Sequence, residues 1–377
     1  MASKKLKFYV IAGEASGDLH GSNLIKALRI ENNELEFRSW GGDKMQAEGG
    51  NVVKHIRELA FMGFIEVIAN LRTILRNIKV CKADIEAFHP DAIILIDYPG
   101  FNLRIAEWAK EKGIKVIYYI SPQVWAWKQS RVHKIKRCVD HMYVILPFEK
   151  EFYAKFDYAV EYLGHPLLDA IDNFKADQLS KEEFYSNYNL NDKPIIAILP
   201  GSRKQEVSVK LPIMLEAVKY YTNYQIVVAG APSLDLEFYS TLKSDDVKII
   251  HGKTYDLLSF AEAAIVTSGT ATLETALLGI PEVVCYKGSE ISYRIAKRLI
   301  KIKYISLVNL IMDREVVKEL IQHECNSTNI QLELDKILLG GNSRNKMLED
   351  FTELKNKLGA GGASRNVAQS LLKTILP

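Results

Sequence analysis

The amino-acid sequence predicts an α/β protein built of two Rossmann-like, doubly wound domains that face each other across a cleft. Short β-branched runs alternate with segments of helical period, which is typical of a parallel sheet with helices on both faces. The alternation occurs in two successive sets, each of which opens with a strand, a glycine turn and a helix. The chain has 377 residues, more than one hydrophobic core usually serves, so two domains are expected.

The first set of strands begins at residues 7–12, ahead of the glycine turn at residues 13–17. The other strands of this set are expected at residues 92–97, 115–120, 142–146 and 161–163. The strands of the second set are expected at residues 195–199, 225–229, 247–250, 264–267 and 282–286.

The domain boundaries follow from these two sets. A polar stretch at residues 172–180 is the predicted linker, so the N-terminal domain covers residues 1–172 and the C-terminal domain covers residues 173–340. Glycine-rich breaks then delimit two closing helices within residues 341–377. We expect these helices to pack back on the N-terminal domain.

The composition excludes several classes of protein. With 48% apolar residues, 25% charged residues and a net charge of +3, the chain is typical of a soluble globular protein and is not strongly attracted to polyanions. Its four cysteines lie far apart and form no C-x-x-C pair, which argues against a zinc site or a disulfide framework and favours a reducing cytoplasm. The apolar run at residues 8–12 is too short for a signal peptide or a membrane span.

The most informative segment is residues 199–207, LPGSRKQEV, because it follows an apolar strand and precedes a helix. Backbone N–H groups at a helix N-terminus, the helix dipole and a forked arginine together favour bound anions. Gly201, Ser202 and Arg203 are therefore candidate phosphate-binding residues. The alternative is an ordinary strand-to-helix turn.

A second segment of this kind is residues 267–274, TSGTATLE. Ser268, Gly269 and Thr270 offer N–H groups and hydroxyls to a second anion, and Glu274 can accept hydrogen bonds from a vicinal diol such as ribose. A capping box with Glu274 facing solvent is the alternative. Together with the Arg203 loop, this segment favours a nucleotide diphosphate with its sugar as the ligand.

Asp97 is the candidate general base. It follows four consecutive apolar residues at positions 93–96, and partial desolvation there would raise the pKa of the carboxyl group and improve it as a base for a hydroxyl group. The alternative is a helix N-cap or turn aspartate before Pro99. Parallel strands would bring this strand end and the two phosphate segments to the same cleft.

The turn at residues 13–18, GEASGD, lacks the close glycine pair of the dinucleotide fingerprint, so NAD is not expected. Its small residues would let a ligand approach Ser16 and Gly17, and a purely steric role is the alternative. The chain has no Asp-x-Asp pair that would hold a metal against a nucleotide diphosphate. We expect no metal and no cofactor, with Arg203 and helix dipoles neutralising the diphosphate.

Two amphipathic segments suggest further contacts. Apolar residues recur at helical spacing over residues 61–78, which favours either a core helix or a surface for acyl chains formed by Met62, Ile65, Ile68 and Leu71. Residues 294–303 place five cations against an apolar side, as in a basic amphipathic helix at an anionic membrane. A merely solvated helix is the alternative for this second segment.

Seven motifs, in chain order, resemble the lipid-A-disaccharide synthase family over about residues 6–326. They are GEASGD at residues 13–18, MGFIEV at 62–67, SPQVWAW at 121–127, LPFE at 146–149, LPGSR at 199–203, SGTATLE at 268–274 and SLVNL at 306–310. The tryptophan-containing motif is the most specific of them.

The resemblance implies a B-type glycosyltransferase fold and an inverting reaction. The 2,3-diacylglucosamine group of a UDP conjugate would pass to the 6-hydroxyl of 2,3-diacylglucosamine 1-phosphate, giving a β-1′,6-linked disaccharide and UDP. Carried over from the family, Asp97 is the base, Arg203 an essential arginine on the phosphate side, Asn309 a polar residue needed for activity and Glu274 the ribose ligand. Many members have a second acid where this chain has Gly100.

The resemblance also implies partners and a location. Because both substrates are acylated, the protein is expected to dock on the cytoplasmic face of the inner membrane without spanning it. Members of the family are often dimers, so the resemblance is compatible with a homodimer.

Two alternatives stay open at this stage. A UDP-sugar 2-epimerase, or another UDP-sugar transferase of the same fold, would use the same nucleotide chemistry. A nucleic-acid-binding protein would use the basic segments at residues 128–137 and 294–303, but the near-neutral total charge disfavours it, and no nucleic-acid partner is expected.

Overall fold

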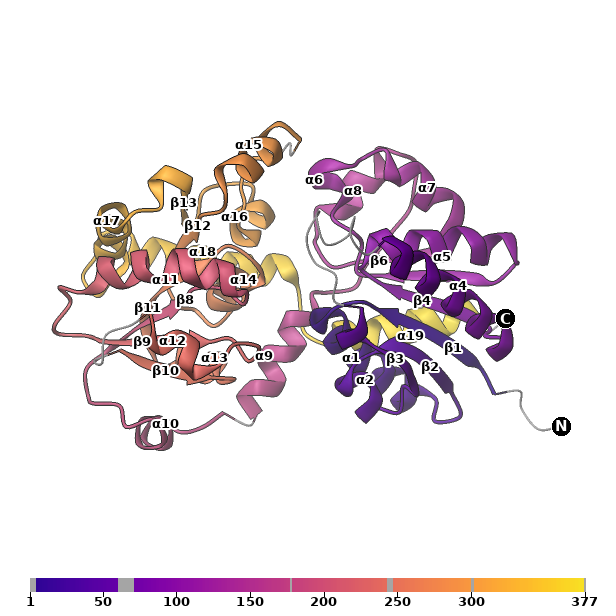
Figure 1. Cartoon of the computed structure of the whole chain (residues 1–377), viewed down its shortest axis with the longest axis horizontal. Helices are drawn as coiled ribbons and strands as arrows, with labels where there is room; N and C mark the ends of the chain where they lie inside the picture. Colours follow the sequence, from indigo (N-terminus) through magenta and orange to yellow (C-terminus); the bar gives the residue numbers. More distant parts are fainter. Residues whose placement is uncertain (1–4, 60–70, 177, 243–246, 300–301, 376–377) are drawn as a thin grey trace. The chain divides into compact units, whose positions relative to one another are not determined.

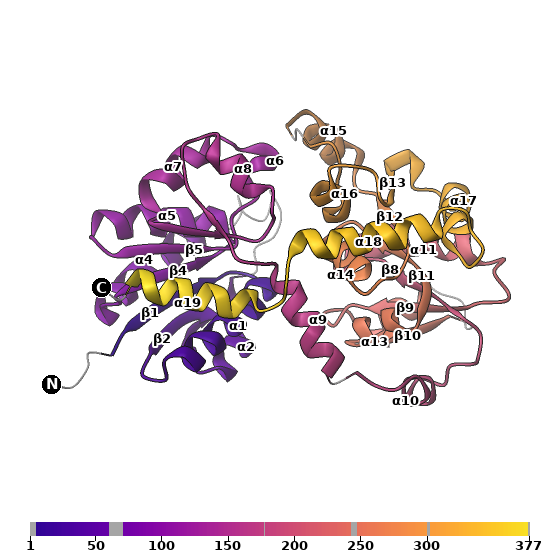
Figure 2. The ribbon, with the colours of Figure 1, turned by 180° about the vertical axis from the view of Figure 1, so that it is seen from behind.

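The computed structural model describes residues 5–59, 71–176, 178–242, 247–299 and 302–375. The chain forms two compact units (Figures 1 and 2). Unit 1 comprises Met1–Asp169 and Ala360–Pro377, and unit 2 comprises Ala170–Gly359.

The sheet of unit 1 is parallel, with the strand order β3-β2-β1-β4-β5-β6-β7. Its strands are β1 (Lys7–Ala12), β2 (Glu36–Gly41), β3 (Val52–His55), β4 (Ala92–Ile96), β5 (Lys115–Tyr119), β6 (His141–Val144) and β7 (Glu161–Tyr162). The strand order reverses between β1 and β4, which makes their carboxyl ends the topological switch point of unit 1.

Helices cover both faces of this sheet. One face packs against α1 (Ala15–Glu31) and α19 (Ala363–Ile375), and the other against α4 (Leu71–Phe88), α5 (Pro99–Glu111) and α7 (Arg131–Cys138). Figure 2 shows α19 and α1 beside each other. The shorter helices are α2 (Asp43–Ala47), η1 (Ile56–Glu58), α6 (Val124–Trp127) and α8 (Glu149–Ala154). Every residue of β4 is buried, as expected for a strand covered on both faces.

Unit 2 repeats this plan with the parallel order β10-β9-β8-β11-β12-β13. Its strands are β8 (Ile195–Leu199), β9 (Gln225–Gly230), β10 (Lys248–His251), β11 (Ala261–Thr267), β12 (Glu282–Tyr286) and β13 (Lys318–Ile321). Its helices are α9 (Pro166–Ala176), which begins in unit 1, α10 (Lys181–Asn187), α11 (Lys204–Val218), α12 (Leu236–Ser240), α13 (Thr254–Ser259), α14 (Thr270–Leu277), α15 (Glu290–Leu299), α16 (Leu307–Met312), η2 (Gln322–Glu324), α17 (Ser327–Ile337) and α18 (Arg344–Leu358). The switch point of unit 2 lies between β8 and β11.

Two doubly wound α/β units with parallel sheets are confirmed, and the predicted strands are present with small shifts at their ends. Three strands were not predicted, namely β2, β3 and β13. β3 and β13 are short edge strands, and β2 (EFRSWG) contains charged and small residues, so none of them has the continuous apolar run of a central strand.

The closing helices differ from the prediction that both pack on the N-terminal domain. Only α19 does so, since it packs against α1 in unit 1, whereas α18 belongs to unit 2 and packs against α14, α16 and α17. Arg314 ties α18 to unit 2 through Asp350 (3.1 Å) and Glu353 (2.5 Å). The polar stretch predicted as a linker begins inside α9, because the helix continues to Ala176.

Candidate active site

A cavity of about 610 Å³ lies at the carboxyl ends of the strands of unit 2. It occupies the switch point between β8 and β11, where open α/β sheets bind ligands and where α11 and α14 begin. Six of the seven predicted nucleotide-binding residues line it: Gly201, Ser202, Ser268, Gly269, Thr270 and Glu274.

Gly201 gives the first turn of this cavity its shape. Its φ of +114° is one that side chains rarely adopt, and a Cβ there would lie 2.6 Å from Oε2 of Glu206. Arg203 follows as the extended N-cap of α11, and no described side chain caps this helix end. The first N–H groups of α11 and its dipole are therefore suited to an anion.

The side chain of Arg203 is 64% exposed, and its Nη1 lies 3.7 Å from Oε1 of Glu206. Arg203 is not among the described residues that line the cavity, whereas Glu206 is. An exposed ion pair of this kind contributes about 0–1 kcal/mol, so a diphosphate could compete for the guanidinium at little cost. Contact between Arg203 and phosphate stays a prediction.

The second turn leads into α14. No described atom lies within 4 Å of the position that a Cβ of Gly269 would take. The Ser268 hydroxyl donates a hydrogen bond to the carbonyl of Ile305 (3.1 Å), which commits it to the protein rather than to a ligand. The backbone N–H groups at the start of α14 are the groups suited to a second anion.

Glu274 is half-buried in the cavity wall and does not face solvent as a plain capping residue would. The hydroxyl of Tyr255 donates to its Oε1 (2.9 Å), and the ring of Phe174 packs edge-on against Tyr255 at 5.4 Å between centroids. Burial raises the pKa of Glu274, and the Tyr255 hydrogen bond opposes that rise. Oε2 is the atom this arrangement leaves for the hydroxyls of a ligand.

Sequence reasoning missed the part of the cavity wall that Tyr255 belongs to. Residues 229–232 comprise the end of β9 and the turn after it, residues 252–256 follow β10, and both stretches line the cavity. Their signal was available, because both follow predicted strands, contain a glycine and must lie at the same sheet edge as the phosphate segments.

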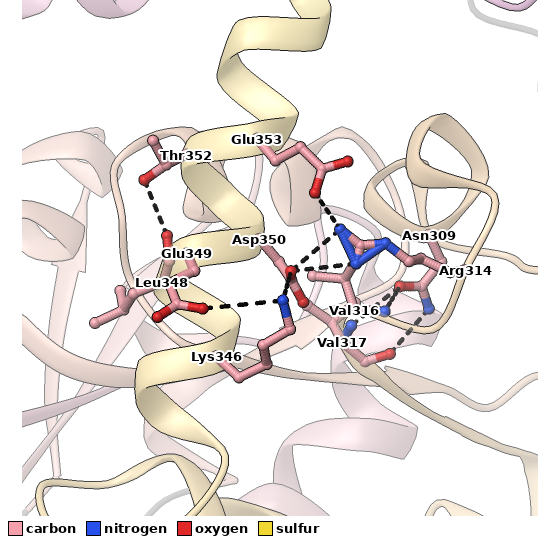
Figure 3. A network of polar contacts seen from close by, with 10 residues as sticks. All are labelled: Asn309, Arg314, Val316, Val317, Lys346, Leu348, Glu349, Asp350, Thr352 and Glu353. Atoms are coloured by element: carbon pink, nitrogen blue, oxygen red, sulfur yellow. Dashed lines mark hydrogen bonds and ion pairs between the residues drawn. The ribbon is translucent and has the colours of Figure 1, made fainter.

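Asn309, which the family resemblance implies is needed for activity, lies in the core and is not among the described residues that line the cavity. It is fully buried, and its Nδ2 donates to the carbonyl of Val317 (2.9 Å) and to Oε1 of Glu319 (2.9 Å). Its Oδ1 accepts the N–H groups of Val316 (2.7 Å) and Val317 (3.0 Å), as Figure 3 shows. These hydrogen bonds use all four positions of the Asn309 amide and leave none of them for a diphosphate.

A chain of hydrogen bonds leads from Asn309 to the cavity wall. Glu319, which it holds, accepts the N–H groups of Ile305 and Ser306, both at 2.9 Å. The carbonyl of Ile305 in turn receives the hydroxyl of Ser268 in the cavity wall. An effect of Asn309 on activity would therefore act through the shape of the second turn.

Asp97 lies at the switch point of unit 1, directly after β4. Asp97 and Tyr98 have φ values of +42° and +47°, a conformation that residues other than glycine rarely adopt. The Asp97 carbonyl accepts the Tyr118 hydroxyl (2.5 Å) and Nδ2 of Asn102 (2.8 Å), so its backbone is held while these bonds leave the carboxylate unused. Strained residues of this kind are concentrated at functional sites.

The Asp97 carboxylate is half-buried. Burial raises its pKa to about 6, the nearby Glu14 carboxylate adds to the rise, and a hydrogen bond from the N–H of Tyr98 opposes it. The predicted rise in pKa is confirmed. A base whose pKa lies just below neutral pH is ionised there and still binds a proton well, as general-base catalysis requires.

The GEASGD turn lies beside this aspartate, and its residues separate into two roles. Ser16 is exposed in the first turn of α1. Gly17 is buried, and a Cβ there would lie 3.1 Å from that of Ala12, so its role is close packing of α1 on β1 and not the predicted ligand contact. Gly13 is required because a Cβ there would lie 2.4 Å from Cγ of Tyr98.

The predicted acyl-binding stripe falls mostly outside the described residues. This applies to Met62, Ile65 and Ile68, and Leu71 is described only as the first residue of α4. Further along α4, Ile78 is buried in the core and Ile74 packs against it, so this part of the stripe is a core face. Leu75 and Val80 are exposed.

The basic helix predicted over residues 294–303 is shorter in the structure, because α15 ends at Leu299. Arg294, Lys297 and Arg298 are exposed on it. Arg294 pairs with Glu290 (3.1 Å), and Lys303 pairs with Asp313 (3.3 Å) outside the helix. Among the described helices none is long and apolar enough to cross a membrane, and the described residues contain no cluster of three His, Cys, Asp or Glu side chains suited to a metal ion.

Comparison with solved structures shows which fold the chain shares. UDP-GlcNAc 2-epimerase from Neisseria meningitidis is similar over 98% of this chain and 100% of its own, with a TM-score of 0.66 and 16% identity. The glycosyltransferase of kitacinnamycin is similar over 99% of this chain and 100% of its own, with a TM-score of 0.68 and 11% identity. At these identities the likeness shows a shared two-unit α/β fold and nothing more.

Sequence comparison is more specific. A family model described as lipid-A-disaccharide synthetase matches residues 8–373. Lipid-A-disaccharide synthase from Syntrophus aciditrophicus is 41% identical over 97% of both chains, and that from Coxiella burnetii is 37% identical over 96% of both chains. The chain belongs to the lipid-A-disaccharide synthase family, and the epimerase alternative is not favoured.

Proposed function

We propose that this protein condenses UDP-2,3-diacylglucosamine with 2,3-diacylglucosamine 1-phosphate, giving the β-1′,6-linked lipid A disaccharide 1-phosphate and UDP. Unit 2 holds the UDP part of the donor, and unit 1 supplies the base. The observation that carries the proposal is the ionisable Asp97 carboxylate, held at a switch point by hydrogen bonds that do not use it. A hydroxyl nucleophile needs such a base, whereas a purely binding protein does not.

The reaction is a single displacement with inversion. Asp97 takes the proton of the acceptor's 6-hydroxyl as that oxygen forms a bond to the anomeric carbon of the donor. The bond from this carbon to the diphosphate oxygen breaks, and the electron pair leaves with UDP. The N-termini of α11 and α14 and the Arg203 guanidinium stabilise the charge on the departing diphosphate.

The nucleotide of the donor fits the cavity of unit 2 in one orientation. The diphosphate would lie against the Gly201–Ser202 and Gly269–Thr270 backbones, and Oε2 of Glu274 would accept the ribose hydroxyls. Family membership and the six lining residues support this placement. Neither a metal nor a cofactor has a part in the proposed reaction.

The experiment that tests this function is product analysis by mass spectrometry. The purified protein is incubated with both substrates, with either one alone, and as its Asp97→Asn variant. We expect disaccharide 1-phosphate and UDP in equal amounts only from the unchanged protein with both substrates. Epimerised or hydrolysed donor without disaccharide would contradict the proposal.

Docking on the cytoplasmic face of the inner membrane belongs to the same proposal, since both substrates carry acyl chains. It is supported by the exposed cations of α15 and by the exposed Leu75 and Val80 of α4. Sedimentation with vesicles of phosphatidylglycerol and phosphatidylcholine tests it. Binding should increase with the anionic lipid and decrease with salt, and binding indifferent to both would contradict it.

A further inference from the structure

The basic segment from Trp127 to Arg137 takes no part in the proposed reaction. It carries five cationic residues, and residues 124–139 contain no acidic one: the cations are Lys128, Arg131, Lys134, Lys136 and Arg137. Two of these have partners elsewhere, because Lys134 pairs with Glu107 (2.7 Å) and Lys136 donates to the carbonyl of Phe156 (3.0 Å).

Lys128 and Arg131 are placed differently. Both lie over the ring of Trp127, with Nζ of Lys128 at 4.3 Å and Cζ of Arg131 at 5.5 Å from the ring centroid. Within the part of the chain that the structure describes, neither forms an ion pair with a carboxylate. Trp127 itself is 47% exposed. Two like charges held on one exposed ring form a site that an anion would stabilise.

This cluster lies at the same sheet edge as Asp97. It follows β5, the neighbour of β4, and Ile96 is in register with Tyr119. Figures 1 and 2 show α5 and α7 beside each other. Lys134 pairs with Glu107, and Lys110 with Asp140, so the two helices run in the same direction. Their N-termini, one after Asp97 and the other at Arg131, therefore lie at the same end.

A residue shared by both sites supports this proximity. The Tyr118 hydroxyl donates to the Asp97 carbonyl (2.5 Å). Burial raises the pKa of this hydroxyl, Asp97 adds to the rise, and the Arg131 guanidinium opposes it. Arg131 and Asp97 thus both affect the pKa of the same Tyr118 hydroxyl.

We infer that Trp127, Lys128 and Arg131 bind the phosphate monoester of the acceptor sugar and so orient its 6-hydroxyl toward Asp97. The guanidinium can take two phosphate oxygens in a forked contact, and the lysine supplies a second charge. This inference rests on the proposed function, because it assigns the acceptor's phosphate to unit 1. The residues are specificity-determining and do not touch the reacting atoms.

Steady-state kinetics of Arg131→Ala and Lys128→Ala test the inference. Two acceptors are compared, one with the 1-phosphate and one with a free 1-hydroxyl. We expect Arg131→Ala to raise KM for the phosphorylated acceptor about 10- to 100-fold, the usual effect of losing a charged hydrogen bond, and to leave KM for the other acceptor and for the donor nearly unchanged.

Arg137→Ala is the matched control, because Arg137 is an exposed arginine at the other end of α7. Arg137→Ala should keep the wild-type preference for the phosphorylated acceptor. Arg131→Lys should retain part of the preference that Arg131→Ala loses. Inorganic phosphate should compete with the acceptor in the wild type and much less in Arg131→Ala.

Three outcomes would overturn the inference. The wild type could use both acceptors equally well, or Arg131→Ala could lower kcat/KM equally for both acceptors. The third outcome is an Arg131→Ala variant that keeps the wild-type preference for the phosphorylated acceptor. If the preference survives while Arg131→Ala binds phosphatidylglycerol vesicles less well, the site serves a lipid headgroup instead. Failure of the proposed function is a separate result, since the wild type would then form no disaccharide from either acceptor.

Discussion

The two units share one topology and present different chemistry at the same point of it. In unit 2 the switch point is open, since Gly201 and Gly269 leave a cavity of about 610 Å³ between two helix N-termini. In unit 1 the ring of Tyr98 lies against Gly13, and the Asp97 carboxylate accepts a hydrogen bond from the N–H of Tyr98. The shared topology therefore places both candidate sites at a switch point, and the few residues after each strand give the two sites different chemistry.

The backbone after each strand accounts for the difference. β8 is followed by Pro200 and Gly201, and the glycine takes a positive φ at little cost. β4 is followed by Asp97 and Tyr98, which take positive φ values at a cost of about 1–3 kcal/mol each. Unit 1 keeps this strain because Tyr118 and Asn102 hold the Asp97 carbonyl.

Replacing Asp97 by Asn should separate the chemistry of unit 1 from the binding of unit 2. Asparagine tolerates the left-handed conformation, so the turn should keep its shape while the base is lost. We expect kcat to decrease at least ~10²- to 10⁴-fold, the usual contribution of a general base. The Kd for UDP, measured by calorimetry, should stay within about twofold. A variant that keeps more than about a tenth of the wild-type rate would remove Asp97 from the mechanism.

Arg203→Ala tests whether unit 2 stabilises the charge of the departing diphosphate. The loss of a group that stabilises charge in the transition state typically costs about 2.7–4 kcal/mol, so kcat should decrease ~10²- to 10³-fold. Lys219→Ala, at the far end of α11, is the control and should behave as the wild type. A near-normal rate for Arg203→Ala would mean that the helix N-termini neutralise the diphosphate without it.

Glu274→Gln should have a smaller effect that depends on the ribose. It replaces a charged acceptor by a neutral one, so we expect the Kd for UDP to rise about 10- to 100-fold. The Kd for 2′,3′-dideoxy-UDP should change little, and Tyr255→Phe should weaken UDP binding less, because that change leaves Oε2 in place. Equal losses on UDP and its dideoxy analogue would show that Glu274 does not bind the ribose.

The sequence was sufficient for features that depend on local chemistry. Strands such as β4 and β8 are continuous apolar runs, and Gly201, Ser202 and Gly269 directly follow strands, so topology alone brings them to one cavity. The raised pKa of Asp97 followed from the apolar residues before it. β3 and β13 were missed because they are short edge strands without a continuous apolar run, and β2 was missed because charged and small residues interrupt it.

Features that depend on contacts between distant residues could not be predicted. Nothing local to Asn309 shows that Val316, Val317 and Glu319 satisfy its amide. Likewise, Tyr255 binds Glu274 across 19 positions of the chain. Gly17 looked suited to a ligand because sequence shows only that a residue is small, not that Ala12 packs against it.

The pH dependence of kcat/KM for the wild type tests whether Asp97 is the general base. Burial raises the pKa of Asp97 to about 6, and only the ionised form can accept a proton. The rate should therefore rise tenfold per pH unit up to about pH 6 and level off above it, and this limb should be absent from the residual activity of Asp97→Asn. A flat profile between about pH 4.5 and 7, or the same limb in the variant, would contradict the assignment of Asp97 as the base.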